Sequence, residues 1–366
     1  MNALIRFRAI MMKELLQLGR DRLTFAMIVG IPVMQMLLFG YAINTDVRNL
    51  TAAVADQANT HLSREFITNL EQTQVLQLEY SVASIQELEQ LLRAGRISIG
   101  IYVPSDFDKR SIDTSRAAVH ILVDGVDPTI VGVANQLRNT PLGFDSTQEM
   151  QSGIGNIEIR PYFNPERRSV VFVIPGLIGI ILTLTMMLFT AVAVVREREH
   201  GNLELLINTP VSTPQLMIGK VVPYIVIGMI QLALILAVGR FLFAVPVRGS
   251  IAELYLAATF FIAANLALGL FVSTVVKTQF QAIQVTIFFL LPSILLSGFI
   301  FPFEGMPVPI QYIGEVLPTT HFIRLTRGIM LRGADLAELQ QELQILAIFT
   351  VAAMTAAILR FAKSLD

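Results

Sequence analysis

The sequence has no cysteine and no tryptophan among its 366 residues, and charged residues make up only 15% of it. Without cysteine there can be no disulfide bond, thiolate metal site or catalytic thiol. Without tryptophan, an aromatic belt at a membrane surface must consist of tyrosine and phenylalanine. Charged residues make up about 25% of an average soluble domain but only 15% of this chain. Hydrophobic residues make up about 45–50% of such a domain and 54% of this chain. The composition therefore predicts residence in a membrane.

Motifs for nucleotide hydrolysis and for acid–base catalysis are also missing. No phosphate-binding loop G-x-x-x-x-G-K-[ST] occurs, because Gly219-Lys220 lacks the upstream glycine and the following hydroxyl residue. The histidines are scattered and suggest neither a Ser/His/Asp set nor a metal site: His61, His120, His200 and His321. We expect a chain that is not itself an enzyme, with His321 as a hydrogen-bonded structural residue. The net charge of −1 gives no indication of nucleic-acid binding.

Long apolar runs predict six membrane-spanning helices. Each run is long enough to cross the roughly 30 Å hydrocarbon layer as an α-helix. The predicted spans are residues 23–43, 170–195, 216–243, 254–276, 280–300 and 343–361. Basic residues before the first span place the N-terminus in the cytoplasm: Arg6, Arg8, Lys13, Arg20 and Arg22. Six spans return the C-terminus to the same side, in agreement with Arg360 and Lys363.

Residues 1–22 are expected to form a helix that lies on the inner membrane surface. Apolar residues recur at helical spacing, opposite a basic face: Leu4, Phe7, Met11, Leu15 and Leu18. An amphipathic targeting peptide is the alternative interpretation. The following apolar run is about 20 residues long, against about 7–15 in the core of a secretory signal, and this favours an uncleaved first span.

Residues 44–169 are more polar and predict a small α/β domain on the outer side of the membrane. Sequence periodicity predicts strands at 51–55, 75–82, 97–103 and 119–123, and helices at about 60–70, 84–94 and 128–138. Ser84 and Glu87 are typical of a capping box, and Asp127-Pro128 of a helix start. Five aspartates lack nearby histidine or glutamate and are interpreted as caps and turns rather than as a metal site: Asp106, Asp108, Asp113, Asp124 and Asp127.

A dense charged segment, residues 196–210, separates two of the predicted spans. Leu203, Leu206 and Ile207 recur on one side of a helix. Pro210 and Pro214 are expected to end it. Such a helix can lie on lipid, fix the topology through its charges, or present a face to a soluble partner.

Within this segment, Glu197-Arg198-Glu199-x-Gly201-x-x-Glu204-x-Leu206 resembles the cytoplasmic motif of ABC-2-type permeases, the membrane subunits of ATP-driven exporters. Asn202 stands where that family usually has threonine. A second stretch resembles the re-entrant outer segment before the last span of the family: residues 296–302, Met306-Pro307, Leu317-Pro318, Phe322 and Arg327-Gly328. The two motifs occur in the family's order, and residues 162–165 resemble the re-entry point of members with a large outer domain.

The resemblance implies an α-helical permease of the bacterial inner membrane, with residues 170–366 forming the second to sixth spans. The partners would be an ABC ATPase that binds ATP and Mg²⁺, a second or paralogous permease, membrane lipids and a periplasmic adaptor. A coupling helix at 196–210 would dock on the ATPase through Arg196, Glu197, Arg198, Glu199, Gly201, Asn202, Leu203, Glu204 and Leu206. The outer re-entrant segment, with its hairpin at 301–332, would be marked by Gly298, Pro302, Pro307, Pro318, Phe322, Arg327 and Gly328.

The hairpin interpretation also accounts for Arg324, Arg327 and Arg332, which the predicted topology places outside, against the positive-inside rule. Their side chains are expected to reach lipid headgroups or partner carboxylates. Four amide side chains lie within predicted spans and face either another helix or a substrate path: Gln35, Gln231, Asn265 and Gln284.

No charged residue lies in the middle of a span, which disfavours a proton relay and favours an external energy source. For members with this outer domain, the resemblance implies efflux of amphipathic or hydrophobic drugs. Export of a lipid or glycan is one alternative. A membrane signal transducer, whose outer domain senses a ligand without transport, is the other.

Overall fold

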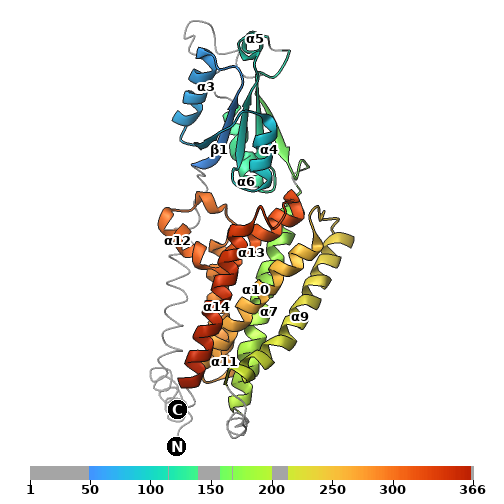
Figure 1. Cartoon of the computed structure of the whole chain (residues 1–366), viewed down its shortest axis with the longest axis vertical. Helices are drawn as coiled ribbons and strands as arrows, with labels where there is room; N and C mark the ends of the chain where they lie inside the picture. The colour runs from blue at the N-terminus through green and yellow to red at the C-terminus, as the bar shows by residue number, and fades with distance from the viewer. Residues whose placement is uncertain (1–48, 114, 139–156, 167, 200–212, 364–366) are drawn as a thin grey trace, which may run out of the picture.

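The computed structural model describes residues 49–113, 115–138, 157–166, 168–199 and 213–363. These residues form an α/β domain stacked on one end of a bundle of long helices (Figure 1). The predicted interfacial helix at 1–22 and the predicted first span at 23–43, with Gln35, lie outside the described residues.

The α/β domain contains one five-stranded sheet in the order β2-β1-β3-β4-β5. The strands are β1 (Leu50–Asp56), β2 (Leu76–Ser81), β3 (Ile99–Val103), β4 (Val119–Asp124) and β5 (Ile157–Tyr162). β1 is parallel to β2 and β3, β4 runs antiparallel to β3, and β5 is parallel to β4. All four predicted strands are confirmed. β5 was missed, although Ile157 to Arg160 alternate between apolar and charged residues.

Helices cover both faces of this sheet: α3 (His61–Gln72), α4 (Ile85–Arg93), α5 (Phe107–Ile112) and α6 (Pro128–Leu137). Alternate residues of β1 point to opposite faces, as the pleat requires. Leu50, Ala52 and Val54 join a buried cluster with side chains of α3, α5 and α6. Ala53 and Ala55 join a second cluster with side chains of α4. The predicted α/β domain is thus confirmed, with the short α5 as an unpredicted element.

The predicted helix starts agree with the observed caps, with one correction. Asp127 accepts a hydrogen bond from the Thr129 backbone at 2.8 Å, and Pro128 follows it in the first turn. The Ser84 hydroxyl accepts from the Glu87 backbone at 3.3 Å. The Glu87 carboxylate, however, accepts from the Ala83 backbone rather than from Ser84, so the predicted capping box is only half formed.

Among the described residues, five helices are long and apolar enough to cross a membrane, and they coincide with five of the predicted spans. They are α7 (Ser169–Glu199), α9 (Thr213–Phe241), α10 (Ile251–Val275), α11 (Gln279–Leu296) and α14 (Gln340–Lys363). Most of α7 and α10 is buried inside the bundle, whereas only small parts of α9 and α14 are buried. Exposed apolar helices of this length suit contact with lipid.

Local signals explain why several spans differ from their predicted bounds. α10 begins three residues before the predicted 254, because the Ser250 hydroxyl caps it by accepting from the Glu253 backbone. α11 ends at Leu296 rather than at 300, and Gly298 follows with a φ of 76°, a conformation that stops a helix. α9 begins at Thr213, three residues before the predicted 216, with Pro214 in its first turn.

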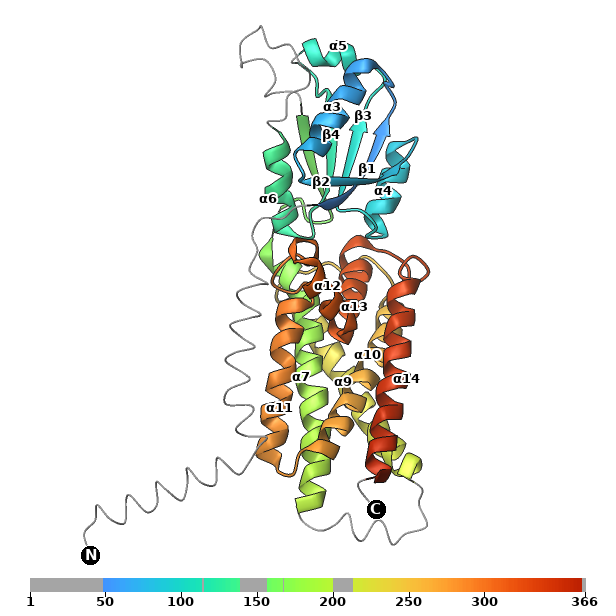
Figure 2. The same ribbon diagram turned by 90° about the vertical axis from the view of Figure 1, so that its left-hand side faces the viewer.

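Short helices fill the chain between α11 and α14, within the predicted hairpin at 301–332. They are a 3₁₀ turn at Phe303–Gly305, α12 (Val308–Val316), α13 (Pro318–Arg327) and a π-helical turn at Gly328–Arg332. α12 and α13 occupy the end of the bundle that faces the α/β domain (Figure 2). α13 is buried among α7, α10 and α14. Its Phe322 ring stacks on Phe261 of α10, with 4.0 Å between the ring centroids.

Candidate functional site

The charged motif begins inside α7 rather than in a separate helix. Arg196 to Glu199 form the last turn of α7, which corrects the predicted helix boundary at 196. Arginine and glutamate are good helix formers, and Val194 and Val195 are still buried just before them, so nothing interrupts the helix at 196. The remaining predicted docking residues lie outside the described part of the chain: Gly201, Asn202, Leu203, Glu204 and Leu206.

Two residues of the motif contact the short turn between α10 and α11. The Arg198 guanidinium donates to the Val276 carbonyl at 3.1 Å. The two carboxylate oxygens of Glu199 accept from the Gln279 backbone at 3.0 Å and from its side-chain amide at 2.5 Å. The sequence predicted both residues for docking on an ATPase, and their contacts within this chain were not foreseen.

The amides predicted to line a substrate path have separate local environments. Gln231 Oε1 of α9 accepts from the Thr185 hydroxyl of α7 at 2.9 Å, which is the helix-to-helix contact that the sequence left as an alternative. Asn265 is fully buried and donates to the Phe261 carbonyl of its own helix at 2.9 Å. Among the described residues, Asn265 Oδ1 and Gln284 Oε1 are buried without a hydrogen-bond partner, and no hydrogen bond joins the three amides. A path through all of them stays a prediction.

At the end of the bundle that faces the α/β domain (Figure 2), α12, α13 and α14 share a charged cluster that sequence analysis missed. Arg324 of α13 pairs with Glu315 of α12 at 2.6 Å and with Glu342 of α14 at 3.3 Å. His321, 1% exposed, contacts the Glu342 carboxylate through Nδ1 and the Glu315 carbonyl through Nε2. Hydrogen bonding of His321 is thereby confirmed. The sequence spacing of these residues follows no single helical period, so only the packing of three helices could reveal the cluster.

Arg327 and Arg332 also have partners within this chain, although Arg327 Nε is buried without a hydrogen-bond partner among the described residues. Arg332 pairs with Asp124 of the α/β domain at 2.7 Å, so the predicted carboxylate partners exist for Arg324 and Arg332. Arg327 instead donates to the carbonyls of Gly298 at 2.9 Å and Phe299 at 3.3 Å. Its guanidinium also lies over the Phe172 ring, 4.1 Å from the centroid.

The residues of the second sequence motif therefore pack together around Arg327 and α13. Gly328 packs closely against Leu339, because an added Cβ would lie 2.6 Å from Leu339 Cδ1 and would require that side chain to shift. Pro307 and Pro318 stand at the starts of α12 and α13, where proline needs no hydrogen-bond partner for its nitrogen. Pro302 precedes the 3₁₀ turn in the same way.

A joint connects the α/β domain to the bundle. Arg332 Nε and Nη2 both donate to Asp124 Oδ2, at 3.1 and 2.7 Å. Arg93, at the end of α4, donates twice to the Gly333 carbonyl, at 3.1 and 2.6 Å. On another side, Arg168 donates to the Phe243 carbonyl beyond α9 at 2.7 Å. The domain is therefore tied to segments that follow both α9 and α13.

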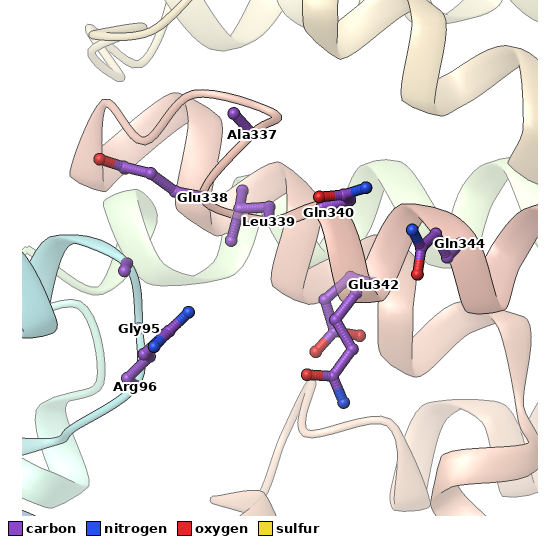
Figure 3. A pocket seen from close by; sticks show the side chains of 10 residues that line it. Gly95, Arg96, Ala337, Glu338, Leu339, Gln340, Glu342 and Gln344 are labelled. Atoms are coloured by element: carbon purple, nitrogen blue, oxygen red, sulfur yellow. The ribbon is translucent and has the colours of Figure 1, made fainter.

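A cavity of about 560 Å³ lies beside this joint, between residues 94–96 and the start of α14 (Figure 3). Its lining is mainly polar and includes Arg96, Glu338, Gln340, Gln341, Glu342 and Gln344.

Each of the five aspartates considered for a metal site already has another role. The partners of the first three are Arg110 for Asp106, the Thr60 hydroxyl for Asp108 and the Ser115 backbone for Asp113.

These features define a multi-span membrane protein with a separate sheet-containing domain. Residues 22–359 match the profile of a family described as ABC-2 family transporter protein. The chain belongs to the ABC-2 transporter family, which confirms the resemblance drawn from the two sequence motifs.

Similar proteins in Escherichia coli cover almost the whole chain. "Probable multidrug ABC transporter permease YbhS" is 30% identical over 339 residues, which span 90% of this chain and 89% of the relative. "Probable multidrug ABC transporter permease YbhR" is 29% identical over 364 residues, 98% of each chain. "Inner membrane transport permease YhhJ" is 29% identical over 323 residues, 86% of this chain and 85% of the relative.

Proposed function

We propose that this chain is the permease subunit of an ABC exporter that moves amphipathic or hydrophobic compounds out of a bacterial cell across the inner membrane. The observation that carries the proposal is similarity along 90% or more of the chain to two relatives named as multidrug ABC transporter permeases. A separate ATPase subunit would bind ATP and Mg²⁺ and supply the energy. The lack of a phosphate-binding loop in the sequence is consistent with that division of labour.

The proposed topology has six spans, with both termini in the cytoplasm. Five long apolar helices support five of these spans, and residues 23–43 would supply the first. The end of α7 and the end of α14 lie at the bundle end opposite the α/β domain (Figure 1). The α/β domain would then be periplasmic, and residues 301–332 would re-enter the outer leaflet.

The proposed mechanism begins at the coupling segment, residues 196–210. ATP binding closes the ATPase pair, the ATPase pushes on this segment, and the spans rearrange to release substrate outward. A second copy of the chain or a paralogous permease would complete the pathway. The charged joint at Arg332 would carry movement of the outer hairpin to the periplasmic domain, where an adaptor protein could bind.

Co-purification and transport measurements test this proposal directly. The full-length chain carries a C-terminal tag and is purified gently from native membranes, and the ATPase activity of the material is assayed with and without hydrophobic drugs. Inverted membrane vesicles then report ATP-dependent drug uptake. We expect Glu204→Lys to abolish ATPase recovery and uptake, while Glu71→Lys, a matched charge reversal on the exposed face of α3, preserves both.

Three results would contradict the proposal. Absence of any nucleotide-binding partner would favour a stand-alone sensor. An associated ATPase without movement of any compound would favour the signal transducer. ATP-driven movement of a lipid or glycan, with no response to drugs, would replace the proposed substrate class.

A further inference from the structure

We propose that Arg198 and Glu199 act as a strut that fastens the inner end of α7 to the α10–α11 turn, so that these three helices move as one unit when the coupling segment is pushed. This inference rests on the proposed function, because it needs a partner that pushes. It assigns the two residues to transmission within the permease and leaves docking to the residues that follow.

The strut engages the backbone groups that helix ends leave without partners. α10 ends at Val275 and α11 begins at Gln279, so the turn between them is short. The last carbonyls of a helix and its first backbone N–H groups have no partner inside the helix. Arg198 donates to the carbonyl of Val276 at the end of α10, and Glu199 accepts from the N–H of Gln279 at the start of α11.

The charges of the strut match the two helix ends. A cation is favoured at a helix C-terminus and an anion at a helix N-terminus, because the peptide dipoles align along the axis. Arg198 and Glu199 are adjacent in sequence and meet the two ends in that order. Reversing either charge would place it against a helix dipole of the same sign.

The turn itself is braced from within, so it can receive a push without unwinding. The Thr278 hydroxyl caps α11 by accepting from the Gln281 backbone at 3.2 Å. The Gln281 side chain returns to accept from the Lys277 backbone at 2.9 Å. A force on Val276 or Gln279 therefore passes to the whole turn.

Close packing continues the strut into the bundle. A buried cluster joins the three helices beside the turn: Met187, Ala191 and Val195 of α7, Val272 of α10 with Val276 just beyond its end, and Ala282 of α11. At Gly269 of α10 an added Cβ would lie 2.6 Å from the Met187 carbonyl, so the two backbones approach closely. Packed interfaces of this density transmit displacement rather than deforming.

The strut predicts a separation of docking from transmission. In the complete complex with its ATPase, we expect Glu199→Ala to retain the ATPase on co-purification but to lower drug transport per ATP hydrolysed by at least about tenfold, in line with loss of its two charge-assisted hydrogen bonds to Gln279. Arg198→Gln should act in the same direction. Loss of the ATPase from either variant would show that the residue serves docking, and would overturn the proposal.

A cross-link can replace the strut, and the cysteine-free sequence provides a clean background. The variant Glu199→Cys/Gln279→Cys, in the full complex, should show the transport defect when reduced. Treatment with a short bifunctional thiosulfonate reagent should restore transport, and a reductant that cleaves the bridge should remove it again. The single variants Glu199→Cys and Gln279→Cys serve as controls that the reagent should not rescue.

Other results of the cross-linking experiment would refute the strut. If the bridge forms and transport stays low or falls further, α7 and the turn must separate during the cycle, and the strut is refuted. If no bridge forms, the two residues are not neighbours in the complex, with the same consequence. A wild-type complex that moves no substrate would instead refute the proposed function.

Discussion

Removing Arg332 tests how firmly the α/β domain is joined to the bundle. Asp124 is 2% exposed and receives two hydrogen bonds from the Arg332 guanidinium. Removing one partner of a buried ion pair costs about 3–5 kcal/mol, because the remaining charge is left without compensation. Asp124 keeps one further partner, the Val126 backbone, so we take the lower figure, about 3 kcal/mol. Arg332→Ala should therefore destabilise the joint by that amount.

Hydrogen–deuterium exchange of the full-length chain in detergent measures this effect. A loss of about 3 kcal/mol corresponds to exchange about 100-fold faster at the end of β4 and the start of α6, where opening exposes the amides. Glu338→Ala is the matched control, because it removes an ion pair with Arg93 that spans 3.7 Å between exposed side chains and keeps both hydrogen bonds from Arg93 to the Gly333 carbonyl. Such pairs contribute about 0–1 kcal/mol.

A double variant checks the physical reason. In Arg332→Ala/Asp124→Asn the buried charge is gone, and the asparagine oxygen can still accept from Val126. We expect this variant to recover part of the stability that Arg332→Ala loses. If the double variant exchanged as fast as the single one, or if Arg332→Ala matched Glu338→Ala, the ion pair would not hold the joint.

Two further predictions concern the packing of the bundle and the sheet of the α/β domain. Gly269→Ala should lower the free energy of unfolding of the detergent-solubilised chain by about 1–3 kcal/mol, because the added Cβ would lie 2.6 Å from the Met187 carbonyl oxygen. Gly132→Ala, with nothing within 4 Å, should leave stability unchanged or raise it, and equal losses would contradict the packing argument. Burial, followed by the nearby Arg160 charge, lowers the pKa of His120 below its usual 6.5. The folded domain therefore binds this proton less readily than the unfolded chain, and stability is lost as pH falls from 6.5 through the folded pKa. Unfolding temperatures measured at pH 7.5 and 5.5 should show this loss, and His120→Gln should reduce it; an unchanged difference would contradict the assignment.

The polar side chains show the limit of sequence analysis for the candidate site. Asn265 and Gln231 both stand out as amides within apolar runs. Only the packing shows that Gln231 meets Thr185, whereas Asn265 points its nitrogen to its own helix. The sequence shows that an amide lies within an apolar run and therefore needs a hydrogen-bond partner. Which group that partner is depends on the helix that packs opposite.

The sequence by itself determined the elements whose signals are local. Apolar runs of spanning length indicated the long helices, period-two alternation indicated four strands, and Asp127-Pro128 indicated where α6 begins. These predictions depend on hydrophobicity, on the pleat and on backbone hydrogen bonds within a few residues, so no distant contact is needed to make them. The two family motifs are local in the same sense.

Only the tertiary structure decided what the charged residues contact. Arg332 meets Asp124, and Glu199 meets Gln279, across 208 and 80 residues of sequence. Chain spacing contains no information about such pairs, because each forms only after separate helices and the α/β domain have packed together. The same physics explains why Arg198 and Glu199 contact the turn between α10 and α11: a charge near a helix end binds whichever backbone group the fold brings beside it.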